Sequence, residues 1–214
     1  MIRACIFDLD GVIVDTAHYH YLAWKRLAKE LGIDLTPEHN EQLKGVSRME
    51  SLEIILNIGQ VKLADKEKEA FTDRKNEWFV EYINEIKPGE IFPGVKPLIH
   101  AMRDMGLKVA LASSSKNARR VIELLGVEDA FDAVVDGTMV THSKPHPEIF
   151  LKAATRLQVQ PAECLVFEDA QAGIEAAKRA GMKCIGIGKA GRLKDADLVL
   201  ENTGDFEVEQ LHSL

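Results

Sequence analysis

The 214-residue sequence lacks the features that would place it outside the class of ordinary folded domains. Aromatic residues make up only 6% of it, and no apolar run approaches the roughly 18 residues of a membrane-spanning helix. The first apolar stretch ends at Asp8, which is too early for a secretory signal. We therefore expect a protein with no membrane partner.

Cysteine is also scarce. Cys5, Cys164 and Cys184 are far apart and form no CxxC pair, which excludes the usual zinc and redox motifs. Each lies in an apolar, strand-like segment, so we expect three buried, reduced side chains in a cytoplasmic protein.

Positive charge is in short supply as well, since 27 lysines and arginines face 34 aspartates and glutamates, for a net charge of −7. An acidic surface repels phosphate backbones, so we expect no nucleic acid partner. A small anionic substrate stays compatible with this charge if a few cations gather in one cleft. The rest of the composition, 46% apolar and 29% charged, is that of a globular protein able to bury a substantial core. We expect a monomer.

Short apolar runs that end abruptly in polar residues predict the strands of a parallel sheet. These runs span residues 4–7, 109–112, 133–135, 165–167, 184–187 and 198–200. The clearest of them are apolar on both faces, which suits strands buried between two helix layers. Helical patterns alternate with them at residues 95–104, 118–125, 147–157 and 170–180. This alternation predicts an α/β fold with a doubly wound parallel-sheet core.

Residues 16–88 interrupt the alternation, because they contain no convincing strand. Their patterns predict four helices, near residues 16–31, 37–44, 48–58 and 65–86. Pro37 suits a first helical turn, and Gly32, Gly45 and Gly59 are predicted to separate the helices. The segment falls between the first strand and the rest of the sheet. We therefore predict an all-helical cap, residues 16–88, inserted into a catalytic core of residues 1–15 and 89–214.

Paired carboxylates follow two of the clearest strands. Asp8 and Asp10 come after the strand at 4–7, and Glu168 and Asp169 after the strand at 165–167. Ligands of such sheets bind outside the carboxyl ends of the strands, so these acids should form one oxygen-rich cluster that suits Mg²⁺. Taken singly, the first pair could be solvated acids in a turn, and Asp169 could cap a helix. Together they favour a metal site, since close carboxylates need a cation to stay ionised.

Phosphate-binding groups follow the strand at 109–112. The segment Ser113-Ser114-Ser115-Lys116-Asn117 offers hydroxyls and backbone N–H groups at the start of a helix. Serines in this position are more often simple helix caps. Lys144, followed by Pro145, would offset the clustered acids and keep Asp8 deprotonated. The alternative is a solvated surface lysine.

The predicted cap carries a second set of polar side chains. Thr16, His20 and Trp24 are four positions apart, so they share one helix face. Cations occur in Lys44-Gly45-Val46-Ser47-Arg48, which Ser51 follows, and in Arg74-Lys75-Asn76. In a cap that closes over an anionic substrate, they could hold a distal phosphate. Alternatively, the helix face is ordinary packing and the cations are solvated.

These motifs, in this order, resemble those of the haloacid dehalogenase superfamily. The resemblance implies that Asp8 is the nucleophile, which forms an aspartyl-phosphate, and that Asp10 is a general acid and base. It also implies that Ser113 and Lys144 hold the transferring phosphoryl group. The metal ligands that it implies for Mg²⁺ are Asp8, the main-chain carbonyl of Asp10 and Asp169, with Glu168 beside the ion.

Within that superfamily, the segments Phe7–Val12, Gln42–Arg48, Arg74–Asn76, Ala112–Asn117 and Ser143–Pro145, with His20 and Trp24, are similar to the β-phosphoglucomutases. The similarity implies a phosphomutase, an isomerase of carbohydrate metabolism, that interconverts β-D-glucose 1-phosphate and D-glucose 6-phosphate through a bound 1,6-bisphosphate. The substrate-binding residues that it implies are Thr16, His20, Trp24, Lys44, Gly45, Val46, Arg48, Ser51, Lys75, Asn76, Ser113, Ser114, Ser115, Lys116, Asn117 and Lys144.

Two alternatives stay open. A sugar-phosphate phosphatase on the same scaffold would use the same Asp8 chemistry and let water take the phosphoryl group. A non-catalytic binding module would keep only the fold, but the intact Asp8, Asp10, Lys144 and Asp169 argue against it.

Two features lie outside the motifs. His146 stands where the family often has a small residue, and we expect it to face solvent. The last 25 or so residues are predicted to form a sheet edge and a terminal helix.

Overall fold

A six-stranded parallel sheet forms the centre of the molecule in a computed structural model, which describes residues 1–189 and 191–212. The strand order is β3-β2-β1-β4-β5-β6. The strands are β1 (Ala4–Phe7), β2 (Lys108–Ala112), β3 (Ala133–Val135), β4 (Cys164–Glu168), β5 (Lys183–Ile187) and β6 (Leu198–Leu200). The order reverses at β1, which lies between β2 and β4, so the crevice for a ligand is expected beyond the carboxyl end of β1.

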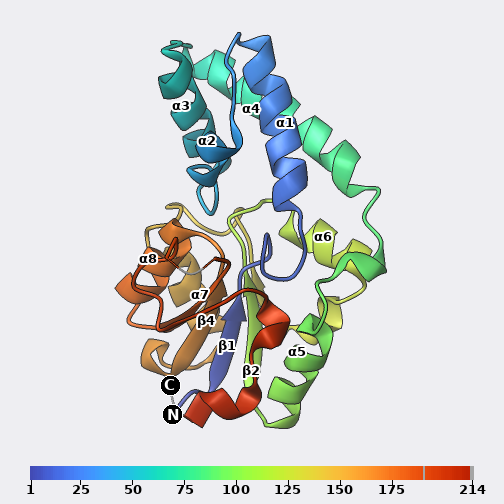
Figure 1. Cartoon of the computed structure of the whole chain (residues 1–214), viewed down its shortest axis with the longest axis vertical. Helices are drawn as coiled ribbons and strands as arrows, with labels where there is room; N and C mark the ends of the chain where they lie inside the picture. Colours follow the sequence, from blue (N-terminus) through green and yellow to red (C-terminus); the bar gives the residue numbers. More distant parts are fainter. Residues whose placement is uncertain (190, 213–214) are drawn as a thin grey trace.

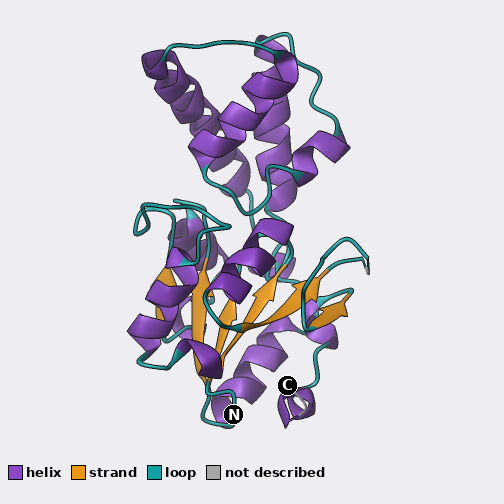
Figure 2. Ribbon diagram, turned by 90° about the vertical axis from the view of Figure 1, so that its left-hand side faces the viewer, coloured by secondary structure: helices purple, strands orange, loops and turns teal. Residues whose placement is uncertain are grey.

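Helices cover both faces of this sheet, which confirms the predicted doubly wound fold (Figure 2). They are α5 (Val95–Asp104), α6 (Ala118–Leu125), α7 (Glu148–Leu157) and α8 (Gln171–Arg179). Side chains of β1 alternate between two hydrophobic clusters: Cys5 and Phe7 belong to one, and Ala4 and Ile6 to the other. Both faces of β1 are therefore buried, which explains why its sequence is apolar throughout.

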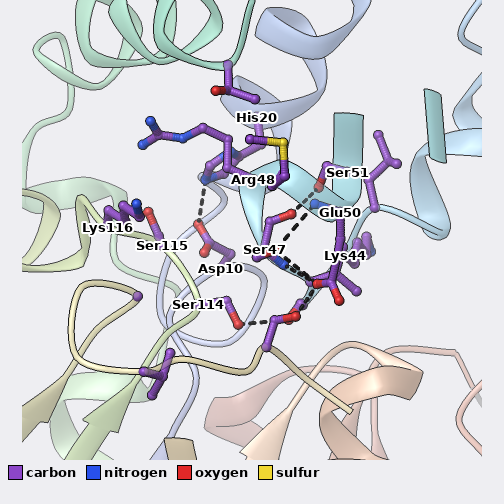
Figure 3. Close-up of a pocket in the computed structure, with 18 of the residues that line it drawn as sticks. Asp10, His20, Lys44, Ser47, Arg48, Glu50, Ser51, Ser114, Ser115 and Lys116 are labelled. Atoms are coloured by element: carbon purple, nitrogen blue, oxygen red, sulfur yellow. Dashed lines mark hydrogen bonds and ion pairs between the residues drawn. The ribbon is translucent and has the colours of Figure 1, made fainter. Parts of the chain in front are cut away.

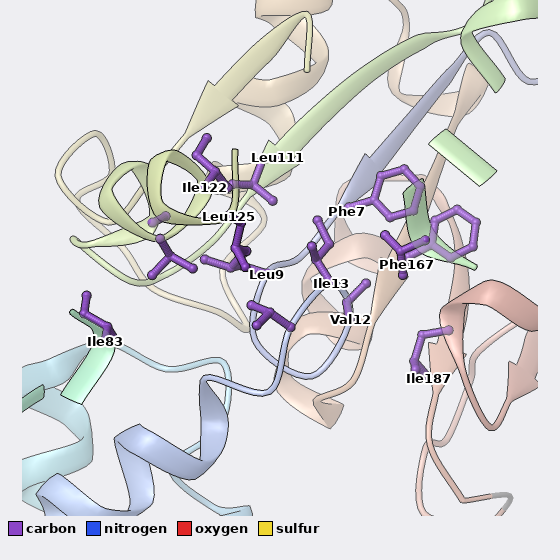
Figure 4. Close-up of a cluster of buried hydrophobic side chains, with 14 of the residues drawn as sticks. Phe7, Leu9, Val12, Ile13, Ile83, Leu111, Ile122, Leu125, Phe167 and Ile187 are labelled. Atoms are coloured by element: carbon purple, nitrogen blue, oxygen red, sulfur yellow. The ribbon is translucent and has the colours of Figure 1, made fainter. Parts of the chain in front are cut away.

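The larger cluster anchors the strand that carries the site. In Figure 4, Phe7 of β1 and Phe167 of β4 lie face to face, with ring centroids 4.5 Å apart and planes inclined by 7°. Each phenylalanine is followed directly by an acidic residue, Asp8 after the end of β1 and Glu168 as the last residue of β4. Packing of the two rings thus fixes the backbone positions from which these carboxylates extend.

Four helices form a separate layer beyond the carboxyl ends of the strands (Figure 1). They are α1 (Ala17–Glu30), α2 (Pro37–Glu41), α3 (Arg48–Gly59) and α4 (Asp65–Ile83). The chain leaves the core and returns to it side by side, since Val14 pairs with Ile91 and the N–H of Phe92 donates to the carbonyl of Ile13 at 2.9 Å. The bounds of the predicted units, 16–88 against 1–15 and 89–214, stay a prediction.

Some predicted element ends differ from the structure. Gly59 is the last residue of α3 rather than a break, and Gln60 adopts the left-handed conformation, with φ of 51°. The predicted terminal helix is a pair of 3-10 segments, Thr203–Asp205 and Val208–His212. Within the described residues, no helix is both long and apolar enough to cross a bilayer.

Candidate active site

A buried ion cluster lies at the carboxyl ends of β1 and β4. Parallel pairing of Phe7 with Phe167 brings Asp8 beside Glu168. The Nζ atom of Lys144 is 2.6 Å from Asp8 Oδ1 and 2.7 Å from Glu168 Oε2. The side chains of Lys144 and Glu168 are 0% exposed and that of Asp8 only 6%, so little water screens these contacts.

The charges of this cluster depend on one another. Burial raises the pKa of Glu168 above its ordinary value, and Lys144 opposes that rise. Burial alone would lower the pKa of Lys144, but Asp8 and Glu168 together raise it. Lys144 is therefore a firmly charged ammonium, positioned to stabilise the ionised form of Asp8.

Three carboxylates at this edge could hold a metal ion. Oxygen atoms of Asp8, Glu168 and Asp169 all lie within 4.8 Å of one another. Gly11 makes room for this group, since a Cβ built on it would stand 2.5 Å from Asp169 Oδ2, and its φ of +80° also favours glycine. An all-oxygen set of this kind suits a hard divalent cation such as Mg²⁺.

The carboxylate of Asp10 is not part of that group of three. The Oδ1 atom of this side chain accepts a hydrogen bond from the hydroxyl of Thr16 and lies 3.8 Å from Nε2 of His20. The backbone N–H of Asp10 donates to Asp8 Oδ2 at 3.0 Å. Burial and the charge of Asp8 raise the pKa of Asp10 to about 7. The predicted cluster of four side chains is therefore a group of three with a fourth carboxylate turned toward the cap.

The segment after β2 connects core and cap. Ser113 is buried and its Oγ accepts a hydrogen bond from the N–H of Ser115 at 3.1 Å. The Ser114 hydroxyl donates to the carbonyl of Gly45 at 2.8 Å, and the Asn117 amide donates to Asn76 Oδ1 at 2.8 Å. This segment thus links the core to the cap, and its role in binding phosphate stays a prediction.

Cations gather on the cap side of the site. Lys75 is 2% exposed, and its Nζ lies 2.7 Å from Nδ1 of His20 and 4.7 Å from the centre of the Trp24 ring. Burial lowers the pKa of both Lys75 and His20 well below their ordinary values, and Arg48 adds to both effects. Arg48 donates to Asn76 Oδ1 at 2.8 Å. An anion bound here would relieve the mutual repulsion of these groups.

One cavity of about 880 Å³ joins the two sides, between cap and core (Figure 3). Of the predicted site residues, those that line it are Asp8, Asp10, His20, Trp24, Lys44, Gly45, Val46, Arg48, Ser51, Lys75, Asn76, Ser114, Ser115, Lys116, Asn117 and Asp169. The other four, Thr16, Ser113, Lys144 and Glu168, are buried and form hydrogen bonds with other residues of the site. The volume is within the range of binding sites for small molecules.

Comparison with known proteins identifies the family to which this fold and these motifs belong. The family model of the haloacid dehalogenase-like hydrolases matches residues 2–181. The chain belongs to this family. It is 45% identical to a β-phosphoglucomutase of Bacillus subtilis, over 98% of this chain and 94% of that protein. It is also 34% identical to a phosphorylated carbohydrates phosphatase of Thermotoga maritima, over 93% of this chain and 90% of that protein.

A solved structure agrees with these relatives. The crystal structure of a β-phosphoglucomutase from Clostridium difficile matches with a TM-score of 0.96 at 45% sequence identity, covering 100% of this chain and 96% of that one. The predicted resemblance to the haloacid dehalogenase superfamily and its β-phosphoglucomutases is therefore confirmed. These relatives imply a divalent metal, and the three carboxylates fit one.

A contact between core and cap beside the cavity was not predicted from the sequence. The Ser143 hydroxyl, from the core, donates to Glu50, which also caps α3 by accepting from the N–H of Ser47 at 3.1 Å. The pattern Ser-x-x-Glu marks a capping box, so it signals the contact of Ser47 with Glu50 but not the contact of Ser143 with Glu50. Arg74, grouped above with the cap cations, instead pairs with Glu30 at 2.8 Å and does not line the cavity. His146 is exposed as predicted, but it also lines the cavity.

Proposed function

We propose that this enzyme interconverts β-D-glucose 1-phosphate and D-glucose 6-phosphate through a bound β-glucose 1,6-bisphosphate. The observation that carries the proposal is the cavity between cap and core, lined on one side by Asp8 and Asp10 and on the other by Arg48 and Lys75. Such a cavity has one end for the phosphoryl group being transferred and another for the phosphate that is not. The 45% identical β-phosphoglucomutase of Bacillus subtilis supports the choice of sugar.

In the first half of the proposed reaction, a carboxylate oxygen of Asp8 attacks phosphorus of the bisphosphate. The bond between phosphorus and the sugar oxygen breaks, and Asp10 donates its proton to that oxygen. Phosphate charge is balanced by Lys144, whose ammonium already lies 2.6 Å from Asp8 Oδ1. The product is an aspartyl-phosphate and a sugar monophosphate.

In the second half, a molecule of β-glucose 1-phosphate replaces the glucose 6-phosphate and presents its 6-hydroxyl group to the aspartyl-phosphate, so that the bisphosphate is formed again and can turn to place its 1-phosphate at Asp8. Asp10 takes the proton of this hydroxyl, whose oxygen attacks the phosphorus on Asp8, and the carboxylate of Asp8 leaves. A carboxyl group with a pKa of about 7 serves in both directions, because both of its forms are populated at neutral pH.

The proposed metal is Mg²⁺, held by Asp8 and Asp169 with Glu168 in the same group. Once bound, it would neutralise charge on the oxygens of the transferring phosphoryl group. Glu168 also accepts from Lys144 and from the N–H of Ala170, at 2.7 and 3.1 Å, so its carboxylate is held in position by the protein.

A phosphatase of phosphorylated sugars is the second candidate, favoured by the phosphatase of Thermotoga maritima among the relatives. A mutase must keep water from its aspartyl-phosphate. Contacts that close the cap on the core support the mutase: Ser114 with Gly45, Asn117 with Asn76, Ser143 with Glu50, and Lys44 with Asp169 at 3.2 Å. The monomeric state and the cytoplasmic location stay predictions.

Product partition tests the proposal. The enzyme is incubated with β-glucose 1-phosphate, Mg²⁺ and a trace of the bisphosphate, and glucose 6-phosphate and free phosphate are both measured. We expect glucose 6-phosphate as the main product, and almost none from the α-anomer, which is the matched control. Free phosphate as the main product would make the enzyme a phosphatase.

A further inference from the structure

A second group of metal-binding side chains lies outside the carboxylate cluster. His142, His146 and Glu148 each offer a ligand atom, and these three atoms all lie within 4.8 Å of one another. The two imidazole rings have centroids 4.5 Å apart and planes inclined by 30°. The group occupies the segment between β3 and α7, and both histidines line the mouth of the cavity.

Glu148 is a fixed anion in this group. Its carboxylate accepts hydrogen bonds from the N–H of His142 at 2.8 Å and from the N–H of Thr141 at 3.1 Å, and it pairs with Lys152 at 2.6 Å. Hydrogen bonds from Lys152 and from the His142 backbone lower the pKa of Glu148 to about 2. The carboxylate is therefore ionised and held by its own segment, which is the arrangement that a metal ligand needs.

The imidazoles make only long contacts and are open to solvent. Nδ1 of His142 is 3.2 Å from Glu148 Oε2, and Nδ1 of His146 accepts from the N–H of Glu148 at 3.3 Å. The side chain of His142 is 63% exposed. A cation can reach these nitrogens and replace both contacts at little cost, because each is near the long limit of a hydrogen bond.

We propose that His142, His146 and Glu148 form a site for a transition-metal ion of the Zn²⁺, Ni²⁺ or Co²⁺ type, with water at the remaining positions. Two imidazoles and one carboxylate suit these ions, whereas Mg²⁺ prefers oxygen ligands alone. The site is thus chemically distinct from the carboxylate cluster. The two histidines stand two positions before and two after Lys144, so a bound ion would link the ends of the segment that carries this lysine.

Zinc titration of the full-length enzyme by calorimetry tests the site, with excess Mg²⁺ present to occupy the carboxylate cluster. We expect one Zn²⁺ ion to bind. Loss of a residue that only orients a metal ligand lowers metal affinity about 10–100-fold. His142 and His146 are proposed as ligands themselves, so H142A and H146A should each weaken Zn²⁺ binding by at least on the order of a hundredfold. H100A is the matched control, since His100 is an exposed histidine on α5, and it should bind as the wild type does.

A second measurement needs no variant. The chain has seven histidines, and paramagnetic Ni²⁺ should broaden the imidazole NMR signals of His142 and His146 before the others. Zinc affinity that survives the double change H142A/H146A would place the ion elsewhere and overturn the proposal. The absence of Zn²⁺ binding to the wild type, or broadening that spares these two histidines, would overturn it equally.

Discussion

Replacing Lys144 by methionine should destabilise the protein far more than the same replacement of Lys75, although both ammonium groups are buried. Lys144 contacts two carboxylate oxygens, at 2.6 and 2.7 Å. Lys75 instead contacts His20 at 2.7 Å and the faces of the Trp24 and Phe79 rings, at 4.7 and 4.8 Å. One lysine compensates buried negative charge, whereas the other contacts an imidazole and two aromatic rings directly, and the nearby charge of Arg48 adds to the cost of burying it.

The direction of each pKa shift gives the sign of the effect. The pKa of Lys144 is raised in the folded protein, so its protonation stabilises the fold at any pH below the ordinary lysine pKa, and this stability is lost as pH rises through the folded value. The pKa of Lys75 is lowered in the folded protein, mainly by burial. Protonation of Lys75 therefore destabilises the folded protein increasingly as pH falls below the ordinary lysine pKa. At pH 7, therefore, Lys144 stabilises the fold and Lys75 works against it.

The magnitudes follow from the partners left behind. Removing one member of a buried ion pair costs about 3–5 kcal/mol, because the other charge stays buried and unpaired. In Lys144→Met the carboxylates of Asp8 and Glu168 are left in that state. In Lys75→Met no carboxylate is stranded and a desolvation cost disappears. We expect its free energy of unfolding to lie within about 1 kcal/mol of the wild type, or above it.

Urea unfolding followed by circular dichroism, with a chelator present and at pH 7, measures both variants. With a slope of about 1–3 kcal/mol per molar, Lys144→Met should lower the midpoint by about 1 M or more. Adding Glu168→Gln to Lys144→Met should recover part of the loss, since one stranded charge is removed. Equal losses in Lys144→Met and Lys75→Met would refute the reasoning, because burial alone would then decide the outcome.

Further predictions concern turnover. Asp8→Asn should keep the circular dichroism spectrum of the wild type and lose essentially all conversion of β-glucose 1-phosphate; activity near that of the wild type would contradict the proposed nucleophile. Chelation should abolish turnover and added Mg²⁺ should restore it, whereas full activity in excess chelator would leave the carboxylates without a metal role. Arg48→Ala should lower the mutase rate by on the order of a hundredfold, the effect of a few kcal/mol from one lost charge-assisted contact. Hydrolysis of acetyl phosphate, which has no distal phosphate, should fall much less. His20→Ala should depress the mutase rate and leave the Mg²⁺ affinity measured by calorimetry unchanged, and equal losses of both activities in these two cap variants would make the cap residues structural.

The strands and core helices could be predicted from the sequence because burial imposes regular patterns on them. Helices α5 and α6 begin and end at the predicted residues, where apolar periodicity and a following glycine agree. Lys144 is different, since it lies 136 positions from Asp8 along the chain. No local pattern brings the two together. The balance of charge suggested that this lysine offsets the clustered acids, and the family resemblance added its role at the phosphoryl group.

Directions of side chains were harder to predict than their positions. Side chains two apart lie on the same face only within a strand, and β1 ends at Phe7, so strand geometry does not fix the direction of the Asp10 side chain. Beyond the strand end, the hydroxyl of Thr16 decides where that carboxylate turns. The contact of Ser143 with Glu50 depends on how cap and core meet, which neither segment encodes by itself.

Identification of the phosphorylated residue tests the proposed mechanism most directly. The enzyme is mixed briefly with β-glucose 1,6-bisphosphate and Mg²⁺, quenched in acid, digested and examined by tandem mass spectrometry, with D8N as the control. We predict one phosphoryl group on the peptide that contains Asp8, and none in the variant. A phosphoryl group on another residue, or none on a wild-type enzyme that still turns over, would contradict the mechanism.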